Sequence, residues 1–364
     1  MRKLLLCFWS FTLALTGAAQ AQREDSTDRA AGSSSAVVST LAGKARTPGS
    51  ADGAGEAARF AWPMGIAVTA AGMIYVTDAY AHTVRQVTPA GIVSTLAGVA
   101  GAKGSSDGQG PAARFNHPVG IAVAADGTLY VADADNHTIR KITPAGTVTT
   151  IAGQAGLKGS TDGPASLARF NCPHGIAVDL NGTIYIADTF NRTVRQLTAA
   201  GQITTIAGTA GANGTTDGMG PTARFNHPSG VAIDATGSLY VTDNGNHTVR
   251  KITATGAVTT LAGLARKKGS TDGAGSLARF DTPNGIAVDK NQVLYVADYI
   301  SSTVRKILPT GEVSTLAGAA RGWGSQDGAG ADARFLFPFG VAVDASGTTI
   351  YVADSQGRTV RLIR

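Results

Sequence analysis

Residues 116–170 decide the fold, because the rest of the chain repeats this stretch: NHPVGIAVAADGTLYVADADNHTIRKITPAGTVTTIAGQAGLKGSTDGPASLARF. Proline recurs every 55 residues, at 63, 118, 173, 228, 283 and 338. Phenylalanine recurs with the same spacing, at 60, 115, 170, 225, 280 and 335. Such self-similarity is typical of repeat architectures. The complete units are 61–115, 116–170, 171–225, 226–280 and 281–335.

Each unit is predicted to contain four strands. In the second unit they are 121–123, 128–132, 138–143 and 147–151, separated by turn-forming residues. The first two runs are continuously apolar, which indicates strands covered on both faces. A small sheet of this kind needs a neighbour on each side, and a ring supplies one to every sheet. We therefore predict an all-β fold, a six-bladed β-propeller with four antiparallel strands per blade.

The sixth unit is divided between the two ends of the chain. Residues 336–364 begin it, and residues 37–60 match its missing end. We expect a strand at 37–41 to complete the blade formed by strands from 340–364, which ties the ends together. An open solenoid would instead need polar caps at its ends.

Composition agrees with a folded, turn-rich chain. Of 364 residues, 47 are Gly, 43% are hydrophobic and 15% are charged. These values exclude a disordered chain, and the glycines lack the three-residue period of collagen.

The N-terminus predicts export. Residues 1–21 resemble a signal peptide, with Arg2 and Lys3 before an apolar run that ends in Ala19-Gln20-Ala21. Residues 22–36 are expected to be a flexible lead-in, so the mature protein would be a periplasmic or extracellular monomer without membrane insertion. Loss of Arg2 and Lys3 reduces the net charge from +6 to +4. This weak excess is spread along the chain and does not indicate nucleic-acid binding.

Four segments of the unit resemble the NHL repeat: GIAV, LYVAD, NHT and RKITP. The resemblance extends from 37 to 364, and the Asn-His-Leu of the family stands here as Asn-His-Thr at 136–138 and 246–248. It implies a six-bladed propeller, and members of the family mostly act as binding platforms. We therefore expect an interaction scaffold for a protein, a peptide or a glycan.

Two sets of recurring Asp and Arg residues are predicted to be structural. In the first, a bidentate pair would join the second and third strands: Asp78, Asp133, Asp188, Asp243, Asp298 and Asp354 with Arg85, Arg140, Arg195, Arg250, Arg305 and Arg361. In the second, each long loop carries an Asp that we expect to pair with an Arg seven residues later, as Asp52 with Arg59. Calcium is the alternative for this loop, but one carboxylate per loop falls short of its usual ligand number.

Functional residues are expected where the units differ, beside the repeated Pro at the mouth of the central channel. The candidate ligand-binding residues are Trp62, Met64, His117, Cys172, His174, His227, Asn284, Phe337 and Phe339. Blades six and one contribute apolar residues and blades two to five contribute polar ones, which suits a ligand with one apolar and one polar side. Cys172 is the one cysteine that remains after signal cleavage, so it is either a sheltered small residue or a reactive thiol.

An enzyme is the less favoured alternative. His117, His174 and His227 lie on consecutive blades and could hold zinc. In the NHL-propeller peptidyl-hydroxyglycine amidating lyase, however, the zinc histidines follow the Pro, and here only His174 does so. Gluconolactonase-like propellers hold a divalent cation with Glu, Asn and Asp, and no such cluster is evident. A metal-dependent lyase or lactonase-type hydrolase at the channel mouth therefore stays open, and we expect no cofactor and assign no catalytic residue.

Overall fold

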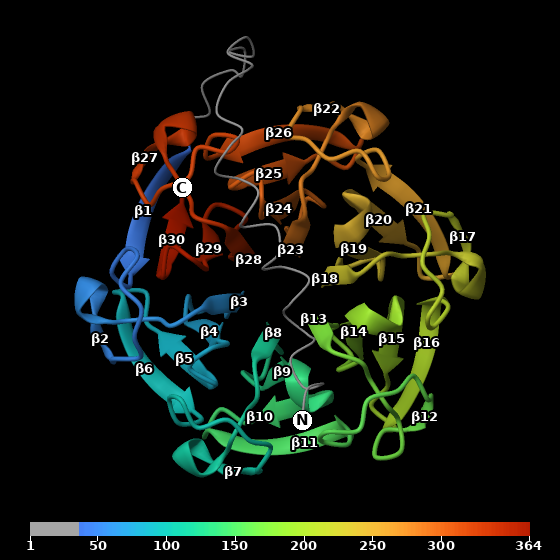
Figure 1. Cartoon of the computed structure of the whole chain (residues 1–364), viewed down its shortest axis with the longest axis horizontal. Helices are drawn as coiled ribbons and strands as arrows, with labels where there is room; N and C mark the ends of the chain where they lie inside the picture. Colours follow the sequence, from blue (N-terminus) through green and yellow to red (C-terminus); the bar gives the residue numbers. More distant parts are fainter. Residues whose placement is uncertain (1–35) are drawn as a thin grey trace, which may run out of the picture. The chain divides into compact units, whose positions relative to one another are not determined.

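The computed structural model describes residues 36–364. The expected signal peptide, and the expected lead-in except Ala36, lie outside the described residues. The described chain forms six antiparallel sheets of five strands each, arranged as blades around a central axis (Figure 1). The prediction of an all-β six-bladed propeller is therefore confirmed. No helix among the described residues is long and apolar enough to cross a membrane.

The blades follow one another along the chain, and each takes its innermost strand from the segment that begins at the repeated Pro. Blade one contains β2 (Gly53–Ala54), β3 (Pro63–Val68), β4 (Ile74–Asp78), β5 (Thr83–Val87) and β6 (Ile92–Ala97). Blade two contains β7 (Gly108–Gln109), β8 (Pro118–Val123), β9 (Leu129–Asp133), β10 (Thr138–Ile142) and β11 (Thr147–Gly153). Blade three contains β12 (Gly163–Pro164), β13 (Pro173–Val178), β14 (Ile184–Asp188), β15 (Thr193–Leu197) and β16 (Gln202–Gly208).

The second half of the ring has the same plan. Blade four contains β17 (Gly218–Met219), β18 (Pro228–Ile233), β19 (Leu239–Asp243), β20 (Thr248–Ile252) and β21 (Ala257–Ala262). Blade five contains β22 (Gly273–Ala274), β23 (Pro283–Val288), β24 (Leu294–Asp298), β25 (Thr303–Ile307) and β26 (Glu312–Ala317). Blade six contains β27 (Gly328–Ala329), β1 (Val37–Ala42), β28 (Pro338–Val343), β29 (Ile350–Asp354) and β30 (Thr359–Ile363).

Short 3-10 helices lie in the loops of the described chain. They are η1 (Gly55–Ala57), η2 (Gly110–Ala112), η3 (Ala134–Asn136), η4 (Thr189–Asn191), η5 (Gly220–Thr222), η6 (Asn244–Asn246), η7 (Gly275–Leu277) and η8 (Gly330–Asp332).

Blade six is closed as the split repeat predicts. β1 pairs with β30, with Val38 opposite Ile363 and Thr40 opposite Arg361. The backbone N–H of Val37 also donates to Arg364 O at 2.7 Å. β1 and β30 lie side by side although they come from opposite ends of the described chain (Figure 1).

The fifth strand of each blade was not predicted. The long loop that leads into a blade adds two residues to that blade's outer edge, as β7 does when Gly108 pairs with Val148 of β11. A two-residue Gly-containing segment has no strand-like pattern, so sequence periodicity cannot reveal it. The innermost strand also begins earlier than expected, at Pro118 rather than at Ile121 in blade two.

The hydrophobic core lies between adjacent blades, because each sheet is apolar on both faces. One cluster joins Phe60, Ile66 and Val76 of blade one to Ala353 and Val360 of blade six. The six recurring phenylalanines are fully buried in these layers, as predicted. Removing a side chain of this size from a core costs about 3–5 kcal/mol.

Glycine is required where neighbouring blades approach most closely around the axis. A Cβ at Gly120 would collide with the carbonyl oxygen of His174 in the next blade, and a Cβ at Gly340 would collide with that of Met64. The second contact joins blade six to blade one, so the inner ring is closed by the same backbone contact at that seam.

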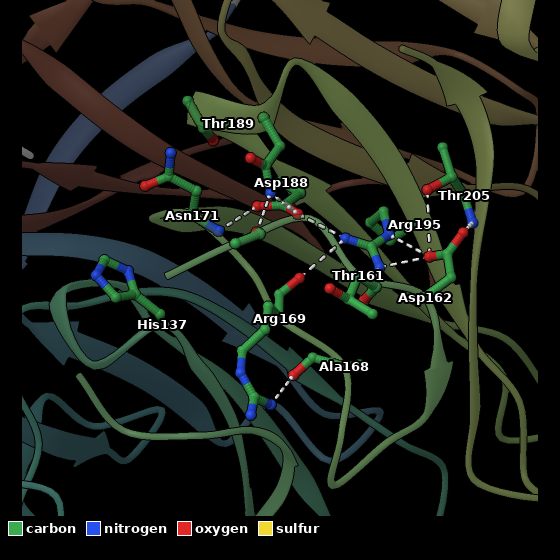
Figure 2. Close-up of polar contacts among 12 residues, drawn as sticks. His137, Thr161, Asp162, Ala168, Arg169, Asn171, Asp188, Thr189, Arg195 and Thr205 are labelled. Carbon is green, nitrogen blue, oxygen red and sulfur yellow. Dashed lines mark hydrogen bonds and ion pairs between the residues drawn. The ribbon is translucent and has the colours of Figure 1, made fainter. Parts of the chain in front are cut away.

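One guanidinium in each blade bridges two carboxylates, as blade three shows (Figure 2). Arg195 Nη1 donates to Asp188 Oδ2 at 2.8 Å, and Nη2 donates to Asp162 Oδ1 at 2.5 Å. Asp162 Oδ2 also accepts the backbone N–H of Thr205 at 2.9 Å. The Arg side chain is fully buried and lies over the Phe170 ring, 5.3 Å from its centroid.

These contacts join the Asp and Arg of the first set, with a geometry that differs from the expected one. The Asp and Arg on neighbouring strands are joined through one Arg nitrogen rather than as a bidentate pair, since the second Arg nitrogen binds the loop Asp. The same two ion pairs recur in every blade, with Arg85, Arg140, Arg195, Arg250, Arg305 and Arg361.

The expected clip between the loop Asp and the Arg seven residues later is wrong. Asp52 binds Arg85 instead, at 2.6 Å, and accepts from the backbone and hydroxyl of Thr95. Arg59 donates to backbone carbonyls, including that of Ala58 at 2.7 Å. Both oxygens of the loop Asp are thus engaged by protein donors.

Candidate functional site

The loops that were expected to form the mouth lie on one face of the ring, which we call the top face. It carries the links between the second and third strands and the long loops between blades. These two kinds of loop contact each other: Arg46 N donates to Gly357 O and Arg321 N to Ser301 O, both at 2.9 Å.

The residues before and after each repeated Pro have different environments. Those after the Pro are buried around the channel, among them Met64, His174, Asn284 and Phe339. Four candidates that precede the Pro have a left-handed backbone, with φ of 51° at His117, 54° at Cys172, 59° at His227 and 57° at Phe337. Trp62 stands in the equivalent position of blade one without a positive φ.

Histidines in the repeat slot hold neighbouring blades together. His82 Nδ1 accepts the backbone N–H of His117 in the next blade at 3.2 Å, and His137 and His247 do the same for Cys172 and Thr282. Accepting at Nδ1 requires a neutral ring. Burial lowers the pKa of His82 to about 4, which agrees with this role.

The seam between blades six and one departs from this pattern. The repeat slot of blade six holds Arg358, whose guanidinium carbon lies 4.4 Å from the Trp62 ring centroid. Arg358 Nη1 and Trp62 Nε1 are both buried and have no hydrogen-bond partner within the described part of the chain. Unsatisfied buried donors are costly, and where they occur they indicate a missing acceptor.

Aromatic rings extend from this seam along both neighbouring blades. On one side, Trp62 contacts Tyr80 with centroids 4.9 Å apart, and Tyr80 contacts His117 at 5.3 Å. Arg358 interacts electrostatically with the buried Asp78 carboxylate and with the Tyr80 and Tyr299 hydroxyl groups. We call Trp62, Tyr80, Tyr299, Trp323, Phe337, Phe339 and Arg358 the aromatic crescent.

On the other side of the seam, Tyr299 contacts Phe337 at 5.1 Å and Phe339 at 6.0 Å. Trp323 in the following long loop contacts Phe337 at 5.9 Å, with its ring tilted by 31°. Burial raises the pKa of Tyr299, so its hydroxyl stays protonated at neutral pH.

The exposed fractions of the side chains show which residues of the crescent lie at the surface and which lie below it. Trp323 is 44% exposed and Tyr80 is 38% exposed, whereas Phe337 and Phe339 are 6% and 7% exposed. The structure therefore buries both Phe side chains, with Phe337 against Trp323 and Phe339 against Tyr299. That Trp62, Phe337 and Phe339 contact a ligand stays a prediction, with the exposed contacts assigned to Trp323 and Tyr80.

Sequence reasoning missed Trp323 and Arg358. Alignment of the repeats gives the signal for both: the slot of Trp323 holds Pro, Lys or Asn in the other units, and the slot of Arg358 mostly holds His. Trp323 and Arg358 therefore replace the residue types that most of the other units carry in these slots. Such departures from a repeated pattern are expected at functional sites.

The three histidines considered for zinc do not form a metal centre. No group of three or more His, Cys, Asp or Glu side chains between residues 36 and 364 is arranged to hold a metal ion. Phe190 contacts both His174 and His227, with centroids 6.4 and 5.3 Å away. His117 Nδ1 instead lies 2.6 Å from Asp135 Oδ2.

Cys172 occupies a fully buried position. No cysteine among the described residues is free, since Cys172 is disulfide-bonded.

Comparison with known proteins identifies the repeat. The family model described as NHL repeat matches residues 115–142, 170–197 and 225–252, which are the first three strands of blades two, three and four. The chain therefore carries NHL repeats folded as a six-bladed β-propeller.

Similar proteins extend well beyond the region they share with this chain. Protein SUPPRESSOR OF QUENCHING 1, chloroplastic, of Arabidopsis thaliana is 32% identical over 296 residues, covering 75% of this chain and 28% of that protein. NHL repeat-containing protein 2 of Homo sapiens is 28% identical over 268 residues, covering 65% of this chain and 36% of that protein. The chain spans about a third of the length of these curated relatives.

Solved structures of similar fold include binding proteins and enzymes. An auxiliary nutrient binding protein from Bacteroides thetaiotaomicron superposes with a TM-score of 0.69 at 16% identity, covering 91% of this chain and 76% of that one. A streptogramin B lyase superposes with a TM-score of 0.56 at 15% identity, covering 90% of this chain and 97% of that one. At such identities the likeness shows the fold alone.

Proposed function

We propose that this chain is an exported binding module that holds an acidic glycan at the aromatic crescent. NHL-repeat propeller relatives, together with a structural neighbour named as a nutrient binding protein, support a binding scaffold. Among the protein, peptide and glycan ligands expected from the sequence, the acidic glycan matches the chemistry of the crescent best.

One observation carries the proposal. Arg358 Nη1 and Trp62 Nε1 are donors without an acceptor among residues 36–364, and they belong to side chains that stack on each other. A carboxylate would satisfy both donors, because a guanidinium forms its strongest hydrogen bonds with such groups. Tyr80, which contacts Trp62, and Trp323, which contacts Phe337, have exposed rings that provide flat apolar surfaces for the faces of sugar residues.

The charge of the surrounding loops agrees with an acidic ligand. The long loops of the top face carry exposed basic residues, whereas the Asp of each loop is engaged by an Arg. The exposed cations are Lys44, Arg46, Lys103, Lys158, Arg266, Lys267, Lys268 and Arg321. A concentration of one sign of charge on one face attracts ligands of the opposite sign.

Tryptophan fluorescence tests the proposal directly. The sequence has three Trp, of which Trp9 lies in the expected leader, so both Trp of the mature chain belong to the crescent. We expect trigalacturonate to change the fluorescence saturably and maltotriose of equal length to bind more weakly. Binding of neither sugar, or equal binding of both, would contradict the acidic-glycan proposal, and saturation by an acidic peptide alone would replace the glycan by a peptide.

Export has a separate test. The cleavage site at Ala19-Gln20-Ala21 predicts that the mature protein recovered from outside the cytoplasm begins at Gln22. An intact Met1 terminus on the exported protein would contradict it. We do not propose a metal-dependent reaction at the channel mouth, because the donor set between residues 36 and 364 offers no such site.

A further inference from the structure

A second feature lies apart from the crescent, on the central axis. The innermost strands of all six blades line a cavity of about 60 Å³, which we call the throat cavity. Its aliphatic lining is a ring of Ile66, Ile121, Ile176, Val231, Ile286 and Val341. A water needs roughly 10–15 Å³ of such volume, so the cavity has room for a few waters or for a small organic group.

His174 gives the throat cavity an unsatisfied polar side chain. It lines the cavity and is 3% exposed, and neither Nδ1 nor Nε2 has a hydrogen-bond partner within the described part of the chain. Burial lowers the pKa of His174 to about 4, so the ring is neutral at pH 7. A neutral imidazole presents one donor and one acceptor. The folded protein therefore leaves both hydrogen-bonding functions of this buried ring for another molecule.

Ser229, on the next blade, adds an acceptor to the same lining. Its Oγ donates to Asn284 Oδ1 at 2.9 Å, and this oxygen also accepts from Asn244 Nδ2 at 2.8 Å. Asn244 Nδ2 lies 3.3 Å from Pro283 O as well, which fixes it as the donor and Asn284 Oδ1 as the acceptor. The hydroxyl proton of Ser229 is thus committed, and only its lone pairs are available to a molecule in the cavity.

We propose that the throat cavity binds a small neutral polyol through His174 and Ser229. A hydroxyl group both donates and accepts, so adjacent hydroxyls can bind the neutral imidazole and the Ser229 oxygen together. The aliphatic ring contacts the carbon backbone of such a ligand. A charged ligand is excluded, because the lining has no charged side chain to offset the loss of hydration.

This site uses other polar groups than the crescent, although Phe339 of the crescent also lines the throat cavity. Its polar residues belong to blades three and four, whereas the crescent is built by blades five, six and one. If acidic sugars do not bind at the crescent, the throat proposal is unaffected. If a polyol does not bind in the throat cavity, the proposal for the crescent is unaffected.

The test follows the His174 ring itself, in the full-length folded protein. Long-range ¹⁵N–¹H spectra of the imidazoles are recorded during titration with meso-erythritol, and with sodium acetate as the charged control. We expect meso-erythritol to shift both His174 nitrogens saturably and acetate to leave them unchanged. The absence of a saturable shift, with the cavity holding water only, would overturn the proposal, and so would an equal response to acetate.

Variants assign the effect to the throat cavity. His174→Phe should abolish binding, and Ser229→Ala should weaken it roughly five-fold, as expected for one neutral hydrogen bond. Ser229→Ala changes little volume and keeps the test open if His174→Phe misfolds. His227→Phe is the matched control, because His227 is a half-buried histidine of the top loops that does not line the cavity. Undiminished binding in Ser229→Ala, or equal loss in His227→Phe, would contradict the assignment.

Discussion

Replacing Arg195 with Met should lower the free energy of unfolding by much more than the loss of its half-buried ion pair with Asp162 would account for. The change leaves Asp188 fully buried with no compensating cation. Breaking a buried pair from one side costs about 3–5 kcal/mol. The partner at the other end of the guanidinium, Asp162, is 42% exposed, so water can replace part of what this half-buried pair loses. Asp162→Asn should therefore cost at most about 1 kcal/mol.

A double variant separates the buried charge from the lost packing. Asp188→Asn added to Arg195→Met removes the charge and keeps an oxygen that can accept the backbone N–H of Asn171. The double variant should therefore be more stable than Arg195→Met alone. Free energies of unfolding come from urea titrations followed by circular dichroism at pH 7. A double variant no more stable than Arg195→Met, or an Asp162→Asn loss as large as that of Arg195→Met, would refute the reasoning.

The pH dependence of the same variant has a definite sign. Burial raises the pKa of Asp188 to about 6 even with Arg195 in place, and removing the cation raises this pKa further. Because the folded pKa then exceeds the unfolded value, protonation favours the folded state. The stability gap between wild type and Arg195→Met should therefore narrow as the pH falls towards about 6 and stay constant below it, where Asp188 is protonated in both folded proteins.

Three further predictions concern the crescent, the blade seams and the ring closure. Trp323→Ala should weaken trigalacturonate binding about 30-fold, as for an aromatic hot spot of about 2 kcal/mol, whereas Leu277→Ala at an exposed site outside the crescent should leave the fluorescence titration unchanged. His82 should titrate by NMR with a pKa of about 4 rather than 6.5. Because the pKa in the folded state is lower than in the unfolded state, the contribution of His82 to stability is lost as the pH falls below 6.5. An NMR midpoint near 6.5 would contradict the role of His82 as a hydrogen-bond acceptor. Val38→Asp, in the buried face of β1, should cost more than about 3 kcal/mol in urea unfolding, and Val37→Asp on the half-exposed face should cost less than about 1 kcal/mol.

The sequence repeat was sufficient to predict the ring of blades, because every blade has the same packing requirements against its neighbours. The positions of Phe60 and Gly120 recur with the blade, and each repeats one packing requirement of the blade interface. The division of the last repeat between 37–60 and 336–364 likewise predicted the pairing of β1 with β30.

Side-chain partners could not be predicted from spacing alone. Asp52 and Arg59 are close in sequence, but the loop between them turns Asp52 towards Arg85 on β5. Phe337 was expected at the surface of the mouth, and its left-handed backbone is accompanied by burial beneath Trp323. Arg358 Nη1, which has no acceptor among residues 36–364, owes its position to the contact of Arg358 with Trp62 across the first and last blades, which no local pattern encodes.

The most direct test of the account compares two arginines that occupy the same repeat slot. Arg358 stacks on Trp62 in the crescent, and Arg192 has the equivalent position in blade three. The affinities of wild type, Arg358→Gln and Arg192→Gln for trigalacturonate and maltotriose are measured by calorimetry. The account predicts that Arg358→Gln loses the preference for the acidic sugar and that Arg192→Gln keeps it. A preference unchanged by Arg358→Gln, or lost equally in both variants, would contradict it.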